Sequence, residues 1–262
     1  MPPERASAGR EARVTDYNPT RVSTVVAVGR RYLPRGWGDF GRQLAIWFGF
    51  VFAYQLARGI ADRHPAQAIA NGFRVIDIET HFTNRLYELT FQQFVQQRHW
   101  LALAVSWTYW NSEFTVLGIG LLYVYVRRHE AFTRFRNTVL LANVLGLFGY
   151  VFLPTAPPRL LGVGFSDSHR DGLVQIAANP YAAMPSLHAA DSLIVGVILA
   201  VLCRRWWAKV FWTVWPAWVW FAVMATGNHF WLDCIAGLGV ALLALGIVYG
   251  PPARRLRVLQ RA

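Results

Sequence analysis

Apolar residues in this chain gather in long blocks separated by short polar or arginine-rich stretches, unlike the alternating or 3.6-residue patterns of soluble folds. Six of these blocks approach the ~20 residues that an α-helix needs to cross ~30 Å of hydrocarbon. In chain order they are Gln43 to Ala57, Glu113 to Val126, Thr138 to Leu153, Leu187 to Leu202, Val210 to Met224 and Trp231 to Tyr249. The pattern predicts an all-α integral membrane protein, built as a bundle of six transmembrane helices.

The stretch from His64 to Trp110 fits this scheme less simply. Its segment Phe91 to Gln97 is amphipathic, whereas Trp100 to Trp110 is apolar but covers only about half a span. We expect additional interfacial helices here, between the first and second spans, with Trp and Tyr side chains at headgroup depth. The alternative is a seventh span.

Arginine clusters orient the six predicted spans. Clusters precede the first span and follow the second, fourth and sixth, so all of them fall on one side of the membrane. Short cytoplasmic loops collect Lys and Arg, which predicts a multi-pass cell-membrane protein with both termini in the cytoplasm and the loops after the third and fifth spans outside. We expect a disordered basic tail at 1–35, a membrane-embedded domain at 36–252 and a second basic tail at 253–262.

Composition agrees with a bilayer protein and narrows its partners. The chain is 55% hydrophobic and 15% charged, against roughly 25% charged residues in an ordinary soluble domain. Its net charge of +12 comes mostly from arginines between the apolar blocks. Arginines in these places set topology and contact lipid headgroups, so we expect a membrane partner and no nucleic acid.

The two outward loops hold the residues most suited to chemistry. One runs from Pro154 to His188, and the other runs from Thr226 to Asp233 at the start of the sixth span. Residues four apart share a helix face, so Asp233 can hold one imidazole nitrogen of His229 and leave the other as a nucleophile toward phosphorus. His188, at the same membrane depth, is suited to act as the general acid on the leaving oxygen.

A phosphate cradle is expected beside these catalytic residues. Ser186 precedes a helix whose first N–H groups can bind an anion, and Arg159 offers a planar fork of donors for phosphate oxygens. Asp191 lies three residues after His188, where it either serves the site or makes an interhelical hydrogen bond. Arg170, in the outer loop, is a further candidate for contacting a headgroup.

Three polar residues lead into the second span on the same side of the membrane, namely Tyr109, Asn111 and Glu113. For these we favour anchoring at the membrane interface over contact with substrate.

Two rival interpretations use the same residues. Two His and one Asp can form part of a zinc site, but no fourth ligand is evident, and Ser186 with Arg159 suits an anion better than a cation. We therefore expect neither a metal nor another cofactor. The non-enzymatic alternative is a lipid transporter or scramblase, although we find no internal repeat of the kind that many transporters contain.

These motifs carry a family resemblance. Pro185 to His188 (PSLH) and His229 to Asp233 (H-x3-D) resemble motifs of the type 2 phosphatidic acid phosphatase superfamily. Within it, Pro154 to Leu161 (PTAPPRLL) looks most similar to the branch of inositol phosphorylceramide synthases and their bacterial relatives. The resemblance covers roughly Gly118 to Val248. It implies a six-helix membrane fold, a metal-independent phosphohistidine mechanism, and lipid phosphates or phosphodiesters as substrates for hydrolysis or transfer.

The chain departs from the broad superfamily pattern at four positions. Phe152 stands where the pattern has a lysine, Leu160 where it has a proline, Leu187 where it has a glycine and Val223 where it has an arginine. The cradle thus has fewer cations than a typical member. This favours a phosphodiester or a bulky polyol phosphate as substrate over phosphatidic acid.

Overall fold

The computed structural model of the protein describes residue 27 and residues 33–61, 64–166 and 181–250. Within these residues the regular elements are all helical, as predicted, and one isolated bridge joins Thr155 to Ala182. The elements are α2 (Gly36–Ala61), α3 (Pro65–Thr83), α4 (Tyr87–Gln96), α5 (His99–Asn111), the π-helical turn η1 (Ser112–Val116), α6 (Leu117–Arg127), α7 (His129–Phe152), the 3-10 turn η2 (Pro158–Leu160), α8 (Leu187–Leu202), α9 (Trp206–Ala225) and α10 (Trp231–Tyr249).

The chain divides into two units, Met1–Leu44 and Ala45–Ala262, and α2 begins in the first and ends in the second. In the first turn of α2, Asp39 accepts hydrogen bonds from Arg42 (2.8 Å) and Gln43 (3.2 Å). A carboxylate there complements the positive end of the helix dipole. The candidate site lies entirely in the second unit. The predicted tails fall almost wholly outside the described residues, so the domain boundaries stay a prediction.

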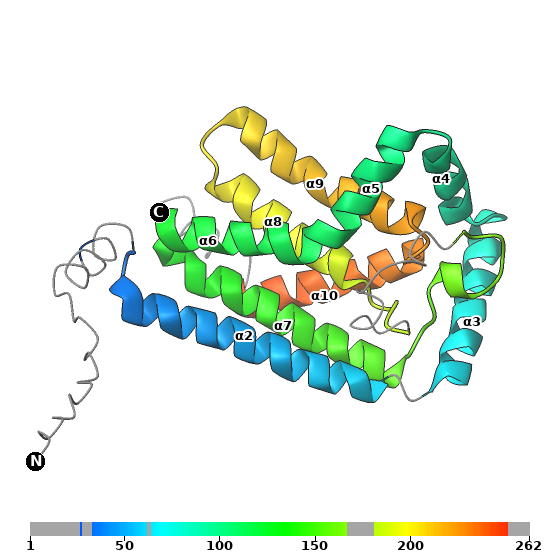
Figure 1. Cartoon of the computed structure of the whole chain (residues 1–262), viewed down its shortest axis with the longest axis horizontal. Helices are drawn as coiled ribbons and strands as arrows, with labels where there is room; N and C mark the ends of the chain where they lie inside the picture. The colour runs from blue at the N-terminus through cyan, green and yellow to red at the C-terminus, as the bar shows by residue number, and fades with distance from the viewer. Residues whose placement is uncertain (1–26, 28–32, 62–63, 167–180, 251–262) are drawn as a thin grey trace, which may run out of the picture. The chain divides into compact units, whose positions relative to one another are not determined.

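The centre of the second unit is α8, which contacts α6, α7, α9 and α10 (Figure 1). Most of its sixteen residues are buried. A helix that is apolar on every side is suited to the middle of a bundle, where neighbours cover it all round. Because α8 carries His188 in its first turn, the packing of this helix also places the candidate site.

Glycines stand where helices approach α8 most closely. A Cβ on Gly196 would meet the Trp212 carbonyl oxygen and the Pro216 ring of α9. A Cβ on Gly237 of α10 would overlap the Ser186 carbonyl oxygen, just before α8 begins. Helices in lipid associate by close van der Waals packing, which small residues allow.

From α6 to α10, each helix runs opposite to the one before it, so their connections gather at two ends of the bundle (Figure 1). The turns from α6 to α7 and from α8 to α9 lie at one end, with the arginines of 127–136 and 204–205. The starts of α8 and α10 lie at the other end. The two candidate histidines and the basic turns are therefore at opposite ends.

Each of the six predicted spans falls in helical structure: α2, η1 with α6, α7, α8, α9 and α10. Within the described residues, α7, α9 and α10 are long and apolar enough to cross a membrane, and α8 is a shorter apolar helix. The count of six stays a prediction. The stretch before the second span forms three helices, α3, α4 and α5, and α5 continues through η1 directly into α6. Their placement at the interface also stays a prediction.

The close approach of α10 to the start of α8 leads to a test with two glycines of one helix. Gly237→Ala should destabilise the fold by about 1–3 kcal/mol, the usual cost of overpacking a tight contact. Gly239→Ala is the matched control, because a Cβ there meets nothing within 4 Å and alanine favours a helix interior by about 0.5–1 kcal/mol. Thermal unfolding of the purified variants in detergent measures both. Equal melting temperatures would contradict the packing described here.

Candidate active site

Three segments that are distant in sequence meet at the end of the bundle that carries the histidines. The backbone N–H of Arg159 donates to the Gly227 carbonyl (3.0 Å), and that of Ser186 donates to the Asp233 carbonyl (3.0 Å). The Thr155 carbonyl accepts a hydrogen bond from the N–H of Ala183, in the segment before α8 (3.1 Å). These backbone bonds bring together the loop after α7, the start of α8 and the start of α10, as predicted from their common depth.

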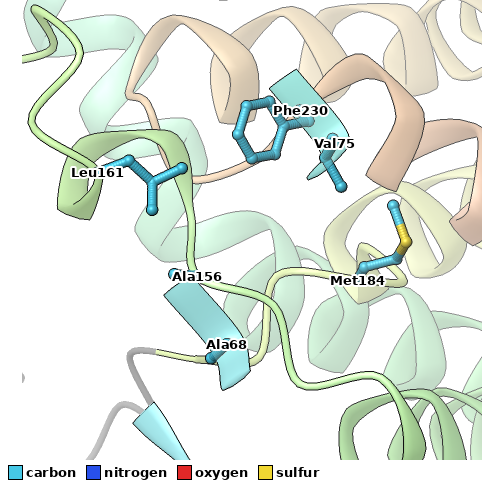
Figure 2. Close-up of a cluster of buried hydrophobic side chains, with 6 residues drawn as sticks. All are labelled: Ala68, Val75, Ala156, Leu161, Met184 and Phe230. Carbon is cyan, nitrogen blue, oxygen red and sulfur yellow. The ribbon is translucent and has the colours of Figure 1, made fainter. Parts of the chain in front are cut away.

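Helix α3 closes this end of the bundle through an apolar cluster. Figure 2 shows Ala68 and Val75 of α3 with Ala156, Leu161, Met184 and Phe230 from the three site segments. Two polar contacts reinforce the cluster: the Asn71 side-chain amide donates to the Pro154 carbonyl (2.8 Å), and the Ala156 N–H donates to the Ala68 carbonyl (2.9 Å). The loop that carries Arg159 is thus held from outside by α3.

His229 is buried, and its ring orientation is set by a backbone carbonyl. Nδ1 lies 2.9 Å from the Ala183 oxygen and 3.6 Å from Oδ2 of Asp233. A carbonyl can only accept, so Nδ1 carries a hydrogen, and in the neutral ring the lone pair is on Nε2. We expected Asp233 to hold an imidazole nitrogen, but the Ala183 carbonyl makes that hydrogen bond, and the Asp233 carboxylate lies only at ion-pair distance. Its Oδ2 accepts from the Phe230 N–H at 2.8 Å, which caps α10.

His188 faces His229, with 5.7 Å between the ring centroids. Its ring stacks on Tyr109, with centroids 4.7 Å apart and planes 13° from parallel. Nε2 lies 3.2 Å from the Tyr109 carbonyl oxygen and 3.3 Å from Oε2 of Glu113. Both neighbours are acceptors, so Nε2 carries a hydrogen.

The structure places Tyr109 and Glu113 against His188. The anchoring of these residues at the membrane interface stays a prediction. Asn111 is different: its side-chain amide donates to the Trp107 carbonyl within the same helix. A spacing of four residues before a predicted span puts two side chains on one face. What that face contacts depends on tertiary packing.

The predicted cradle residues fall into different environments. Arg159 donates through Nε to the Asn228 side-chain oxygen (2.8 Å), and Asn228 immediately precedes His229. Ser186 is fully buried and accepts from the Ala189 N–H (3.3 Å), so it caps α8. Its hydroxyl therefore serves the helix. Arg170 lies outside the described residues.

We predicted that Asp191 either serves the site or makes an interhelical hydrogen bond. The structure shows the interhelical hydrogen bond. The Asp191 oxygens lie 3.2 and 3.1 Å from the Asn143 side-chain nitrogen of α7, and the residue is buried. The geometry favours a role in joining α7 to α8.

Among the described residues, no three His, Cys, Asp or Glu side chains are grouped to hold a metal ion, and we assign no metal ligand.

Two buried glutamates that sequence reasoning missed receive the first N–H groups of α10. Glu88 accepts from Trp231 (2.6 Å) and Glu79 accepts from Leu232 (2.9 Å), next to the bond from Phe230 to Asp233. Three carboxyl groups thus cap one helix directly after His229, at the positive end of its dipole. The spacing of residues could have indicated that Glu79 is buried, because it lies four residues after Val75 on the buried face of α3.

Burial keeps a proton in this group of carboxyls. Glu79 and Glu88 are fully buried, and the second oxygen of each has no hydrogen-bond partner among the described residues. Burial and the neighbouring Glu88 carboxylate raise the pKa of Glu79 to about 9, and burial also raises the pKa of Glu88. Two adjacent buried carboxyls cannot both ionise cheaply. Glu79 is thus protonated at neutral pH.

The raised pKa predicts how stability changes with pH. The folded state holds a proton on Glu79 that the unfolded chain releases above ~4.5, so stability should fall as pH rises toward about 9. Glu79→Gln keeps an acceptor for Leu232 and removes the titration, so its melting temperature should decline less between pH 6 and 9. Asp77→Asn changes an exposed carboxyl of the same helix and should follow the wild type. Parallel curves for all three proteins would contradict this account.

Comparison with known proteins identifies the family of the chain. A family model described as the PAP2 superfamily matches residues 75–247, which include both histidines. The phosphoinositol dihydroceramide synthase of Bacteroides thetaiotaomicron is 27% identical over 146 residues, covering 47% of this chain and 48% of the relative, so the chain spans about half the length of that curated relative. No solved structure gave a significant match. The apolar helices and the family match together make the chain an integral membrane protein that belongs to the PAP2 superfamily.

Proposed function

We propose that this protein is a membrane enzyme that hydrolyses or transfers the phosphate or phospho-headgroup of a lipid through a phosphohistidine at His229. The observation that carries the proposal is the hydrogen bond between His229 Nδ1 and the Ala183 carbonyl at 2.9 Å. It leaves the lone pair of Nε2 for attack on phosphorus. A second imidazole, with its centroid 5.7 Å away, is near enough to serve the same reacting group.

The reaction we propose has two steps. In the first, Nε2 of His229 forms a bond to phosphorus, the bond from phosphorus to the leaving oxygen breaks, and His188 gives that oxygen a proton. In the second, water or an acceptor hydroxyl attacks phosphorus, returns a proton to His188 and releases His229. Asp233, 3.6 Å from Nδ1, stabilises the positive charge on the His229 ring while the phosphoenzyme exists.

Glu113 and Tyr109 prepare His188 for the acid role. The Glu113 carboxylate at 3.3 Å stabilises a cationic ring by Coulomb attraction, and the stacked Tyr109 ring restricts its rotation. Because Nε2 is directed at these two residues, the proton for the leaving oxygen would come from Nδ1. Glu113 is therefore proposed as a positioning residue.

Arg159 is proposed to bind the phosphate oxygens, since its bond to Asn228 fixes the guanidinium next to the nucleophile's loop. Arg170 is proposed as a headgroup contact. The small number of cations in the motifs favours a phosphodiester or polyol phosphate over phosphatidic acid. The relative named phosphoinositol dihydroceramide synthase supports the same substrate class.

The arginine clusters further lead us to propose that the histidine end faces outward and the basic turns face the cytoplasm. In a chain without its two native cysteines, a cysteine at Leu160 should react with an impermeant thiol reagent added outside intact cells. A cysteine at Arg205 should be spared. Labelling at Arg205 with protection at Leu160 would reverse the orientation.

The function is tested by incubating purified protein with labelled phosphatidic acid and phosphoinositol lipids, with and without lipid hydroxyl acceptors, in the presence of a chelator. We expect turnover of the phosphoinositol lipid and acid-labile phosphate on the protein. Loss of activity in chelator would point to a metal enzyme. No turnover of any substrate, in protein that moves lipids between leaflets, would favour the transporter.

Leaving groups distinguish the roles of the two histidines. On a lipid phosphodiester, His188→Ala should lose activity by about 10²–10⁴-fold, because an alkoxide leaves poorly without a proton. On an aryl phosphate, if it is a substrate, the same variant should recover much of its first-step rate and accumulate phosphoenzyme. His229→Ala should be inactive on both substrates.

His129→Ala is the control for this series, because His129 lies at the end of the bundle that carries the basic turns. It should keep wild-type rates on both substrates. Glu113→Gln should lose less activity than His188→Ala on the phosphodiester and little on the aryl phosphate. If the aryl phosphate rescued His229→Ala rather than His188→Ala, the two roles would be exchanged.

A further inference from the structure

At the end of the bundle opposite the histidines, a hollow of about 870 Å³ opens between α5, α6, the end of α8 and the start of α9. Its wall is largely aromatic and includes Trp107, Tyr123, Phe211, Trp212 and Trp215. The volume falls within the ~300–1,000 Å³ of typical ligand sites. Such a wall suits hydrocarbon chains.

Four arginines stand at one end of this hollow: Arg127, Arg128, Arg204 and Arg205. They come from two separate turns, one after α6 and one after α8, that packing brings to the same opening. No aspartate or glutamate is among the described residues that line it. The hollow thus combines an apolar wall with a positively charged rim. Guanidinium groups bind phosphate oxygens in bidentate fashion.

The arginine rim of the hollow is far from the candidate active site, although Trp107 and Val116 of its wall lie next to the segment that contacts His188. His188 is the second residue of α8. Two residues that line the hollow lie at the other end of this helix: Leu199 in its last turn and Cys203 directly after it. At 1.5 Å per residue, Cys203 lies roughly 22 Å along the helix from His188. A molecule with its phosphate among the four arginines could not also place that phosphate at the histidines.

We propose that this hollow is a binding site for one anionic diacyl phospholipid, with its phosphate among the four arginines and its chains along the aromatic wall. The charge complementarity of the rim identifies the occupant, since a zwitterionic lipid carries a cation that the arginines would repel. Basic pockets between membrane helices commonly bind anionic headgroups in this way. The site is independent of the proposed reaction.

Lipid binding to the full-length protein in a neutral detergent tests the proposal. Native mass spectrometry, with increasing phosphatidylglycerol or phosphatidylcholine of the same chain length, gives the occupancy and affinity of each. We expect one tightly bound phosphatidylglycerol and weaker phosphatidylcholine. The double variant R204Q/R205Q should bind phosphatidylglycerol roughly 30-fold more weakly, given the contribution of each basic residue at an anionic membrane surface.

Two further variants separate a site from general surface charge. The control R134Q/R136Q removes two positive charges from the first turns of α7, outside the lining of the hollow, and should keep wild-type affinity. Ala208→Trp fills the hollow without changing charge and should displace the bound lipid. Equal affinity of the wild type for both lipids would overturn the proposal. So would an equal loss in R134Q/R136Q and R204Q/R205Q, or unchanged binding in Ala208→Trp.

Discussion

The arrangement of the candidate site depends on the close contact between the beginnings of α8 and α10. The Ser186 N–H donates to the Asp233 carbonyl, and Gly237 leaves room for the Ser186 carbonyl one turn further along α10. This contact puts the first turn of one helix beside the first turn of the other. His188 and His229 face each other because their helices begin together, and the loop with Arg159 then joins them through Gly227.

The same contact concentrates polar groups in a buried region. Three N–H groups at the start of α10 need acceptors, and carboxyl groups from α3, α4 and α10 itself provide them. Buried carboxyls are costly unless hydrogen bonds or protons satisfy them. The proton on Glu79 therefore stabilises the fold, as the caps of α10 do. It lets α3 and α4 hold α10 without placing three negative charges beside His229.

Much of this could be predicted from the sequence where the signal is local. Apolar runs located the helical segments because each run is itself one element, as with Trp231 to Tyr249. Asp233 lies near His229 because it stands in the first turn of α10, which begins two residues after His229. The hydrogen-bond partner of His229 could not be found in this way, since Ala183 is 46 residues away and offers only a backbone oxygen. Glu113 likewise contacts His188 through packing between helices, which no spacing in either segment reveals.

The π-helical turn at Ser112–Val116 has a consequence for how relatives should be compared. It joins α5 to α6 without a break, so one continuous helix from His99 to Arg127 carries Tyr109 and Glu113 near its middle and Arg127 at its end. A turn of this width holds about one residue more than an α-turn, and such turns are frequent at functional sites. A single-residue insertion into an α-helix is accommodated by a turn of this kind. We therefore expect alignments of relatives to place a one-residue gap between Tyr109 and Leu117, inside a helix rather than in a loop.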